Sequence, residues 1–201
     1  MRDAQHATRF YYVFAVVDVY SRSRVHCNAF EAETAENAVT FLQAAFDQRH
    51  IPLVLHSDNG AAMKSAQTLR LLNERGTEVP RSRPRVSDDN PYIESLFKMM
   101  KYAGFMGKRK YKSLEHCKKV LAAFAAKYNH KWAHSSVNNV TPADRHLWVD
   151  VAVCRKRQQV LEAERAKNPE RWISRQIKQF VPAGSQCLPP DRSVTTVAGT
   201  A

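Results

Sequence analysis

The sequence has few cysteines, and no two of them are close together. Its four cysteines are scattered along 201 residues, at Cys27, Cys117, Cys154 and Cys187. With no Cys-x-x-Cys motif, neither a zinc site nor a disulfide framework is predicted, and this cysteine usage fits a reducing cytoplasm. His130 and His134 have the spacing of a helical metal-binding pair, but no third ligand is evident near them in the sequence.

Long apolar runs are also missing. The longest, from Phe10 to Val17, is far shorter than the ~20 residues that a membrane-spanning helix needs. A signal-peptide cleavage pattern, internal repeats and low-complexity tracts are likewise not visible. No membrane partner is therefore predicted, and the length suits one domain with a real core plus an appendage.

Acidic residues are in short supply. The 19 Asp and Glu residues face 31 Lys and Arg, which gives a formal net charge of +12 and a pI near 9.8. Such an excess suggests a polyanionic partner, and nucleic acid is the usual one. The alternative is a soluble protein that is merely basic.

The pattern of apolar residues predicts strands and helices in a mixed order. Two strands, Phe10 to Val17 and Arg24 to Phe30, should form a hairpin, and Thr34 should cap the helix that follows. The remaining predicted elements are a strand at Leu53 to Asp58, a helix from Ala61 to Glu74 that stops at Gly76, a short strand at Glu78 to Pro80, a helix capped by Asn90, a helix that begins at Ser113, and a helix from Val151 to Lys167 that ends at Asn168 and Pro169.

Two carboxylates stand out because of where they fall in these elements. Asp58 ends an apolar run of strand length and is followed by Asn59 and Gly60, while Glu94 lies in the first turns of the helix that begins at Pro91. The carboxyl end of a buried strand is a usual position for a reactive group in an α/β sheet. Two carboxylates brought together repel, and hard divalent ions such as Mg²⁺ or Mn²⁺ would turn that repulsion into attraction. Taken alone, each residue is better explained as a turn Asp or a solvated Glu, and it is the two contexts at this spacing that favour a functional role.

Basic residues surround the second carboxylate. Lys98 and Lys101 follow Glu94 at i+4 and i+7, so they share its helix face. Before that helix, three arginines alternate through a loop that two prolines keep extended: Arg81, Arg83 and Arg85. All five cations are candidate DNA-phosphate contacts, with a solvated basic loop as the alternative for the arginines.

Two motifs carry a resemblance to a known family. Asp58-Asn59-Gly60 and the segment Asn90 to Phe97, with 35 residues between Asp58 and Glu94, resemble the last two-thirds of the DDE triad of retroviral-type integrases and of OrfB-type insertion-sequence transposases. The segment from Tyr128-Asn129-His130 to Thr141-Pro142-Ala143 resembles the end of the OrfB catalytic core.

The resemblance implies a ribonuclease H-like α/β fold, with a mixed sheet flanked by helices and probably without its first strand. Residues 1–146 would be the integrase core, and residues 147–201 a basic helical extension with a disordered tail. It further implies catalytic and metal-binding roles for Asp58 and Glu94, Mg²⁺ or Mn²⁺ as cofactor, and DNA as partner, namely transposon ends and target. A homo-oligomer or an assembly with intact transposase, in the bacterial cytoplasm at the nucleoid, would follow.

One part of the family pattern is missing. The first catalytic Asp of the family lies on a strand before the hairpin, yet only nine residues without apolar character precede Phe10. Asp3 and Asp18 are possible substitutes, but neither has the family context. The expectation is therefore a core truncated at its N-terminus, with weak catalysis of DNA transposition or none. The alternatives are an inactive remnant that binds DNA or pairs with intact transposase, and a cellular nuclease of the same fold.

Overall fold

The computed structural model describes residues 1, 10–80, 91–102, 110–173 and 178–184. Its two strands, β1 (Tyr12–Val17) and β2 (Arg24–Phe30), form an antiparallel hairpin that pairs Tyr12 with Phe30. The turn between them is held by Asp18, whose carboxylate accepts hydrogen bonds from the backbone N–H groups of Tyr20 at 3.3 Å and Ser21 at 3.0 Å. The predicted hairpin is confirmed, with β1 starting at Tyr12.

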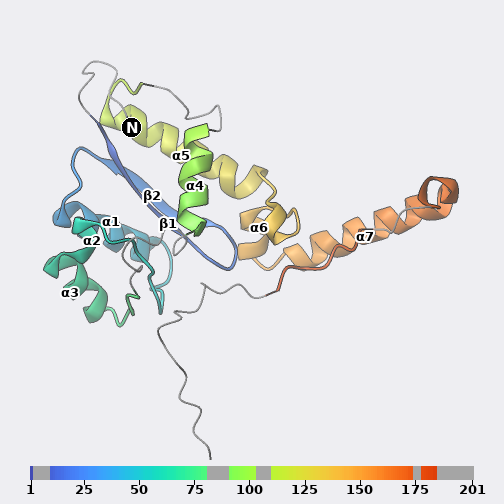
Figure 1. Ribbon diagram of the computed structural model, residues 1–201, viewed down its shortest axis with the longest axis horizontal. Helices are drawn as coiled ribbons and strands as arrows, with labels where there is room; N and C mark the ends of the chain where they lie inside the picture. The colour runs from blue at the N-terminus through green and yellow to red at the C-terminus, as the bar shows by residue number, and fades with distance from the viewer. Residues whose placement is uncertain (2–9, 81–90, 103–109, 174–177, 185–201) are drawn as a thin grey trace, which may run out of the picture.

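Helices surround this hairpin (Figure 1). In chain order they are α1 (Ala35–Gln48), α2 (Ala61–Lys64), α3 (Ala66–Glu74), α4 (Pro91–Tyr102), α5 (Leu114–Lys131), α6 (Pro142–His146) and α7 (Asp150–Lys167), with short 3-10 turns at Ser135–Val137 and Pro169–Trp172. Two of the predicted caps are present: the Thr34 hydroxyl accepts from the Asn37 N–H, and the Ser113 hydroxyl from the His116 N–H. The third, Asn90, lies outside the described residues.

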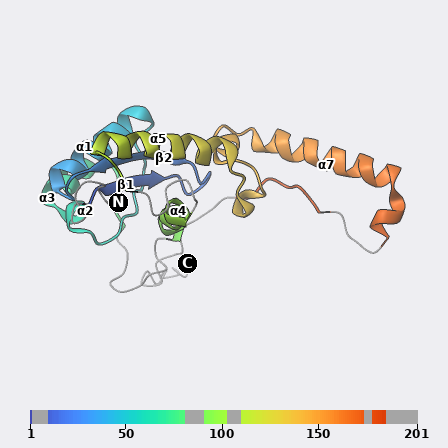
Figure 2. The same ribbon diagram turned by 90° about the horizontal axis from the view of Figure 1, so that it is seen from above.

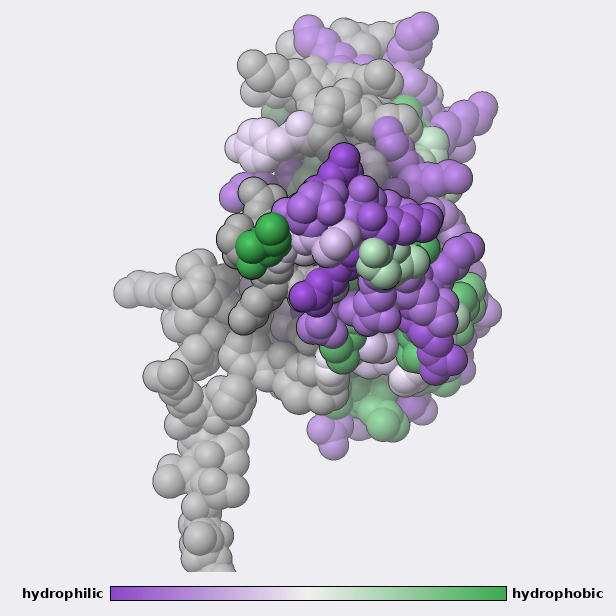
Figure 3. Space-filling view, turned by 90° about the vertical axis from the view of Figure 1, so that its right-hand side faces the viewer, coloured by the Kyte–Doolittle hydropathy of each residue, from purple (hydrophilic) through white to green (hydrophobic). Residues whose placement is uncertain are grey.

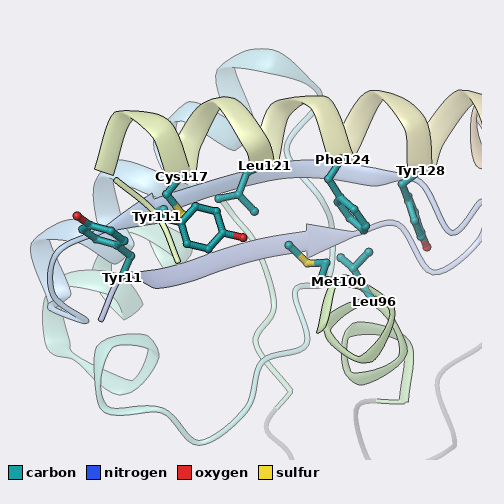
Figure 4. Close-up of a cluster of buried hydrophobic side chains, with 9 residues drawn as sticks. Tyr11, Leu96, Met100, Tyr111, Cys117, Leu121, Phe124 and Tyr128 are labelled. Carbon is teal, nitrogen blue, oxygen red and sulfur yellow. The ribbon is translucent and has the colours of Figure 1, made fainter. Parts of the chain in front are cut away.

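The two faces of the hairpin are covered by different helices. On one face, α4 and α5 enclose a cluster that includes Leu96, Met100, Leu121 and Phe124 (Figure 4). On the other, α1 packs its apolar side chains against Phe14 and neighbouring residues of the sheet, and α3 packs against α1. Helices can pack on both faces because successive side chains of β1 point to opposite faces of the hairpin.

The prediction of a strand at Leu53 to Asp58 is wrong, because the structure shows no continuous strand pairing there. Isolated bridges occur at two positions of this run, Val54 and Ser57. Val54 bridges Glu78 in parallel, with Leu55 N–H donating to Glu78 O at 2.9 Å and Glu78 N–H to Leu53 O at 2.8 Å. The predicted strand at Glu78 to Pro80 is reduced to the same bridge. A regular strand at Leu53 to Asp58 would need to pair with a strand on the side that faces β1. Among the described residues, no strand lies between this segment and β1.

The prediction of a single helix from Ala61 to Glu74 is also wrong, since the structure divides this segment into α2 and α3 at Ser65. That residue is extended, with ψ of 148°, and its hydroxyl accepts from the Thr68 N–H to cap the second helix. The prediction missed this internal cap. The helix does end next to Gly76, whose φ of +68° lies in the left-handed region that favours glycine.

The C-terminal helix α7 extends away from the rest of the molecule in both ribbon views (Figures 1 and 2). Its start is fixed in the core: Arg145 of α6 and Asp150 of α7 form a buried ion pair at 3.1 Å. Seen from its far end, the helix presents mainly hydrophilic side chains (Figure 3). In the described part of the chain, none of the helices has the length and apolar character required to cross a membrane.

Candidate functional site

A groove of about 630 Å³ runs along β1, and Asp58 lies on its wall. The groove is bounded by β1, by the segment that ends at Asp58, by α1, and by Tyr92, Ile93 and Phe97 near the start of α4. The structure therefore brings Asp58 and the helix that carries Glu94 to one surface feature, although they are far apart in sequence.

The Asp58 carboxylate is exposed and positioned by its own turn. Its Oδ1 accepts a hydrogen bond from the Gly60 N–H at 3.0 Å. A Cβ on Gly60 would lie 3.0 Å from that same oxygen, so glycine leaves the space that this close approach needs.

A second carboxylate, Glu33, lies at the same place. Its Oε1 is 3.4 Å from the position that a Cβ on Gly60 would occupy, and Glu33 also lines the groove. Sequence reasoning missed Glu33 because it lies in the loop after β2 and belongs to no motif. The register of the hairpin could have found it: since Phe30 pairs with Tyr12, the residues after β2 lie at the start of β1.

Glu94 lies in the first turn of α4 and is exposed. The helix is oriented by its apolar side chains: Leu96 and Met100 are buried in the core, while Ile93 and Phe97 line the groove. Glu94 adjoins Ile93 in sequence but is not part of the described lining. That Asp58 and Glu94 hold one ion together therefore stays a prediction.

The first turn of α4 is held against the hairpin by a cation–π contact. The Arg22 guanidinium carbon lies 3.7 Å from the centre of the Tyr92 ring, and Arg22 is largely buried. Such a desolvated contact is among the stronger of its kind. It fixes the position of the turn that carries Glu94.

The predicted DNA-binding cations divide into two groups. Lys98 and Lys101 of α4 are exposed, like Glu94, and Lys101 Nζ lies 5.5 Å from the centre of the Tyr102 ring. Arg81, Arg83 and Arg85 lie outside the described residues, so their role stays a prediction.

The structure gives Asp18 a structural role. Burial alone would raise the pKa of its carboxyl, but hydrogen bonds from Ser21 and Tyr20 outweigh it and hold the pKa below its usual value. His146 Nδ1 adds a contact at 3.4 Å. Asp18 follows the end of β1, whereas Glu33 and Asp58 lie at its start, so Asp18 lies at the opposite end of the hairpin. Asp3 lies outside the described residues.

The donor set at Asp58 suits a divalent ion but is incomplete. The carboxylate oxygens of Asp58 and Glu33 are the hard ligands that Mg²⁺ and Mn²⁺ prefer. Within the described ranges, however, no group of three His, Cys, Asp or Glu side chains is arranged to hold a metal. A complete site would need at least one further donor, and Glu94 is the candidate that the sequence offers.

Comparison with solved structures identifies the fold. The catalytic core domain of BIV integrase aligns with a TM-score of 0.56 and 18% identity, over 75% of this chain and 91% of that one. A chain of the simian T-cell lymphotropic virus intasome in complex with PP2A regulatory subunit B56 gamma aligns with a TM-score of 0.59 and 19% identity, over 69% of this chain. The match spans about half of that viral chain, 51%. The molecule thus has the α/β fold of integrase catalytic cores, which is ribonuclease H-like, as predicted.

Family comparison then gives the class. Two family models, both described as Integrase core domain, match residues 3–87 and 75–142. The two ranges overlap, so residues 3–142 form an integrase core domain, of the kind found in integrase and transposase catalytic cores. No curated protein matches the chain significantly.

Proposed function

We propose that this chain takes part in DNA transposition as an insertion-sequence transposase of the OrfB type, by metal-dependent phosphodiester cleavage and strand transfer. The observation that carries the proposal is the placement of Asp58 within an integrase core domain. It lies on the wall of a groove that also contacts the first turn of α4, where Glu94 lies.

In this proposal, Asp58 and Glu94 hold Mg²⁺ or Mn²⁺, with Glu33 as a further oxygen donor near Asp58. Bound divalent ions would activate the attacking oxygen and stabilise the leaving one. The chain supplies the geometry: the Gly60 N–H orients the Asp58 carboxylate, and the Arg22–Tyr92 contact fixes the turn of Glu94.

The cations of α4 would hold the DNA. Lys98 and Lys101 lie one and two turns beyond Glu94 and are exposed, so they can reach phosphates next to the carboxylates. Replacing both by Ala should weaken DNA binding and lower the slope of log affinity against log salt by up to ~2, because each phosphate contact contributes about 0.9. Lys119→Ala, an exposed lysine on α5, is the matched control.

The test of catalysis uses the carboxylates. Glu94→Gln should abolish Mn²⁺-dependent nicking of DNA while leaving DNA binding intact, and Asp58→Asn should do the same. Glu115→Gln is the control, since Glu115 is also an exposed acid in the first turn of a helix. Nicking at the wild-type level by Glu94→Gln would refute the role of Glu94.

A second function is favoured by the incomplete donor set. With no group of three ligands in the described part of the chain, the protein would bind DNA, or pair with intact transposase, without catalysis. Activity that is strongly impaired but still sensitive to Glu94→Gln would support the first proposal. Strand transfer by the purified chain in Mn²⁺ would exclude the second.

A further inference from the structure

Trp148 is an exposed aromatic residue at the end of α6, in a backbone conformation that suits glycine. The Val149 N–H donates to Asp144 O at 2.8 Å and the Trp148 N–H to Arg145 O at 3.1 Å, which is the Schellman pattern of a helix end. Trp148 occupies the left-handed position of that pattern, with φ of 60°. A bulky residue is an outlier there, because its Cβ crowds the backbone.

Packing within the chain does not account for a tryptophan at this position, since Trp148 is 70% exposed. Its ring contacts the Tyr20 ring, with 4.9 Å between the ring centres. The guanidinium carbon of the fully buried Arg145 lies 4.1 Å from the centre of the same Tyr20 ring. Trp148 is therefore held by a fixed neighbour while most of its surface faces solvent.

Exposed cations follow Trp148 on α7, the helix that extends away from the rest of the molecule (Figures 1 and 2). The acid at the start of this helix, Asp150, is buried against Arg145. Arg155 and Lys156 are exposed, and in the part of the chain that the structure describes neither forms an ion pair. Arg155 lies about 8 Å along the helix axis from Asp150, so both cations are within a few nucleotides' reach of Trp148.

An exposed aromatic ring beside unpaired cations has the chemistry that binds single-stranded nucleic acid. Unpaired bases stack on the ring, and the cations contact the phosphates between them. The formal net charge of +12 also favours a polyanionic partner.

We propose that the junction of α6 and α7 binds single-stranded DNA, with an unpaired base stacked on Trp148 and adjacent phosphates on Arg155 and Lys156. Breaking and rejoining DNA strands frees strand ends, and this site would hold such an end. The inference rests on DNA as the partner in the proposed function, but it does not depend on the carboxylates.

The test is titration of the full chain with a fluorescein-labelled single strand of about 12 nucleotides, read by anisotropy, and with the corresponding duplex. Trp148→Gly should keep the fold, because glycine readily adopts the backbone conformation at this position, and thermal unfolding checks this. It should bind the single strand about tenfold more weakly, a typical effect of losing one base–aromatic contact. Affinity for the duplex, whose bases are already stacked, should change less than about twofold.

Three further variants separate stacking from other roles of the patch. Trp148→Phe should bind the single strand like the wild type, since a π-face is retained. Leu147→Ala, which removes an exposed apolar neighbour, should also bind like the wild type. A loss in Leu147→Ala equal to that in Trp148→Gly would indicate an apolar docking surface for a protein and would overturn the proposal, as would wild-type affinity of Trp148→Gly for the single strand.

The cations are tested by the salt dependence of binding. Arg155→Gln with Lys156→Gln should lower the slope of log affinity against log salt by up to about 1.4 for the single strand, since each phosphate contact contributes about 0.7. Arg165→Gln with Lys167→Gln removes the same charge from the end of the same helix and is the matched control. An equal fall in slope for both pairs would refute the assigned phosphate contacts.

The two proposals can fail separately. Glu94→Gln should bind the single strand like the wild type. If Trp148→Gly loses strand binding while nicking does not depend on Glu94, the proposed catalysis is refuted and this inference stands. If nicking depends on Glu94 and Trp148→Gly binds the strand like the wild type, this inference alone is refuted.

Discussion

Replacing Arg145 should strongly lower the free energy of unfolding. It is fully buried, and its guanidinium donates to Tyr20 O at 2.8 Å, to Asp150 Oδ2 at 3.1 Å and to Gly184 O at 2.7 Å. The guanidinium carbon also lies 4.1 Å from the centre of the Tyr20 ring. One side chain thus joins the hairpin turn, α6, the start of α7 and the C-terminal segment.

Arg145→Met would leave the Asp150 carboxylate buried without its cation. Its Oδ1 has no hydrogen-bond partner among the described residues, so nothing there compensates for the loss. Removing one member of a buried pair costs about 3–5 kcal/mol. In a chain of this size, each kcal/mol lowers Tm by about 2–4 °C, so a fall of roughly 6–20 °C is expected.

The measurement is urea and thermal unfolding of the wild type and variants. Arg70→Met is the matched control, because the Arg70–Glu74 pair, at 2.7 Å, is exposed to solvent and should contribute little to stability. Asp150→Leu added to Arg145→Met should recover part of the loss, since no buried charge then remains. A cost below about 1 kcal/mol for Arg145→Met would refute the reasoning.

Two smaller effects follow from single side chains. Burial, with Arg22 nearby, holds the pKa of His134 below its usual 6.5, so His134 stabilises the fold above pH 6.5, and this stability is lost as pH falls through its folded pKa. His134→Gln should therefore reduce the fall in urea midpoint between pH 7 and pH 5, with the exposed His130→Gln as control; an unchanged fall would contradict this. Gly60→Ala should change stability by less than about 1 kcal/mol, since the Asp58 side chain can move away, but should weaken Mn²⁺ binding in a calorimetric titration. Unchanged Mn²⁺ affinity would count against the role of the Asp58 turn.

Local sequence signals predicted those elements whose stability is itself local. The caps at Thr34 and Ser113, the hairpin from Tyr12 to Phe30, and the stop at Gly76 follow from short-range patterns, and the structure confirms them. The family motifs around Asp58 and Glu94 led to an integrase core, which the comparisons support.

Features that depend on neighbours distant in sequence were harder to predict. The run ending at Asp58 has strand composition, but a strand also needs continuous pairing along its edges, and the described residues show only isolated bridges there, at Val54 and Ser57. Glu33 was missed because only the fold brings it to Asp58. The buried pair of Arg145 and Asp150 was missed too, since five residues apart in sequence is no signal of a buried ion pair.

The most direct test of the account is a double-mutant cycle of Mn²⁺ affinity, measured by calorimetry on the wild type, Asp58→Asn, Glu94→Gln and the double variant. If both side chains hold the same ion, each single substitution should weaken Mn²⁺ binding, and the double variant should lose less than the two single losses combined. Wild-type affinity in either single variant, or fully additive losses, would contradict the shared site.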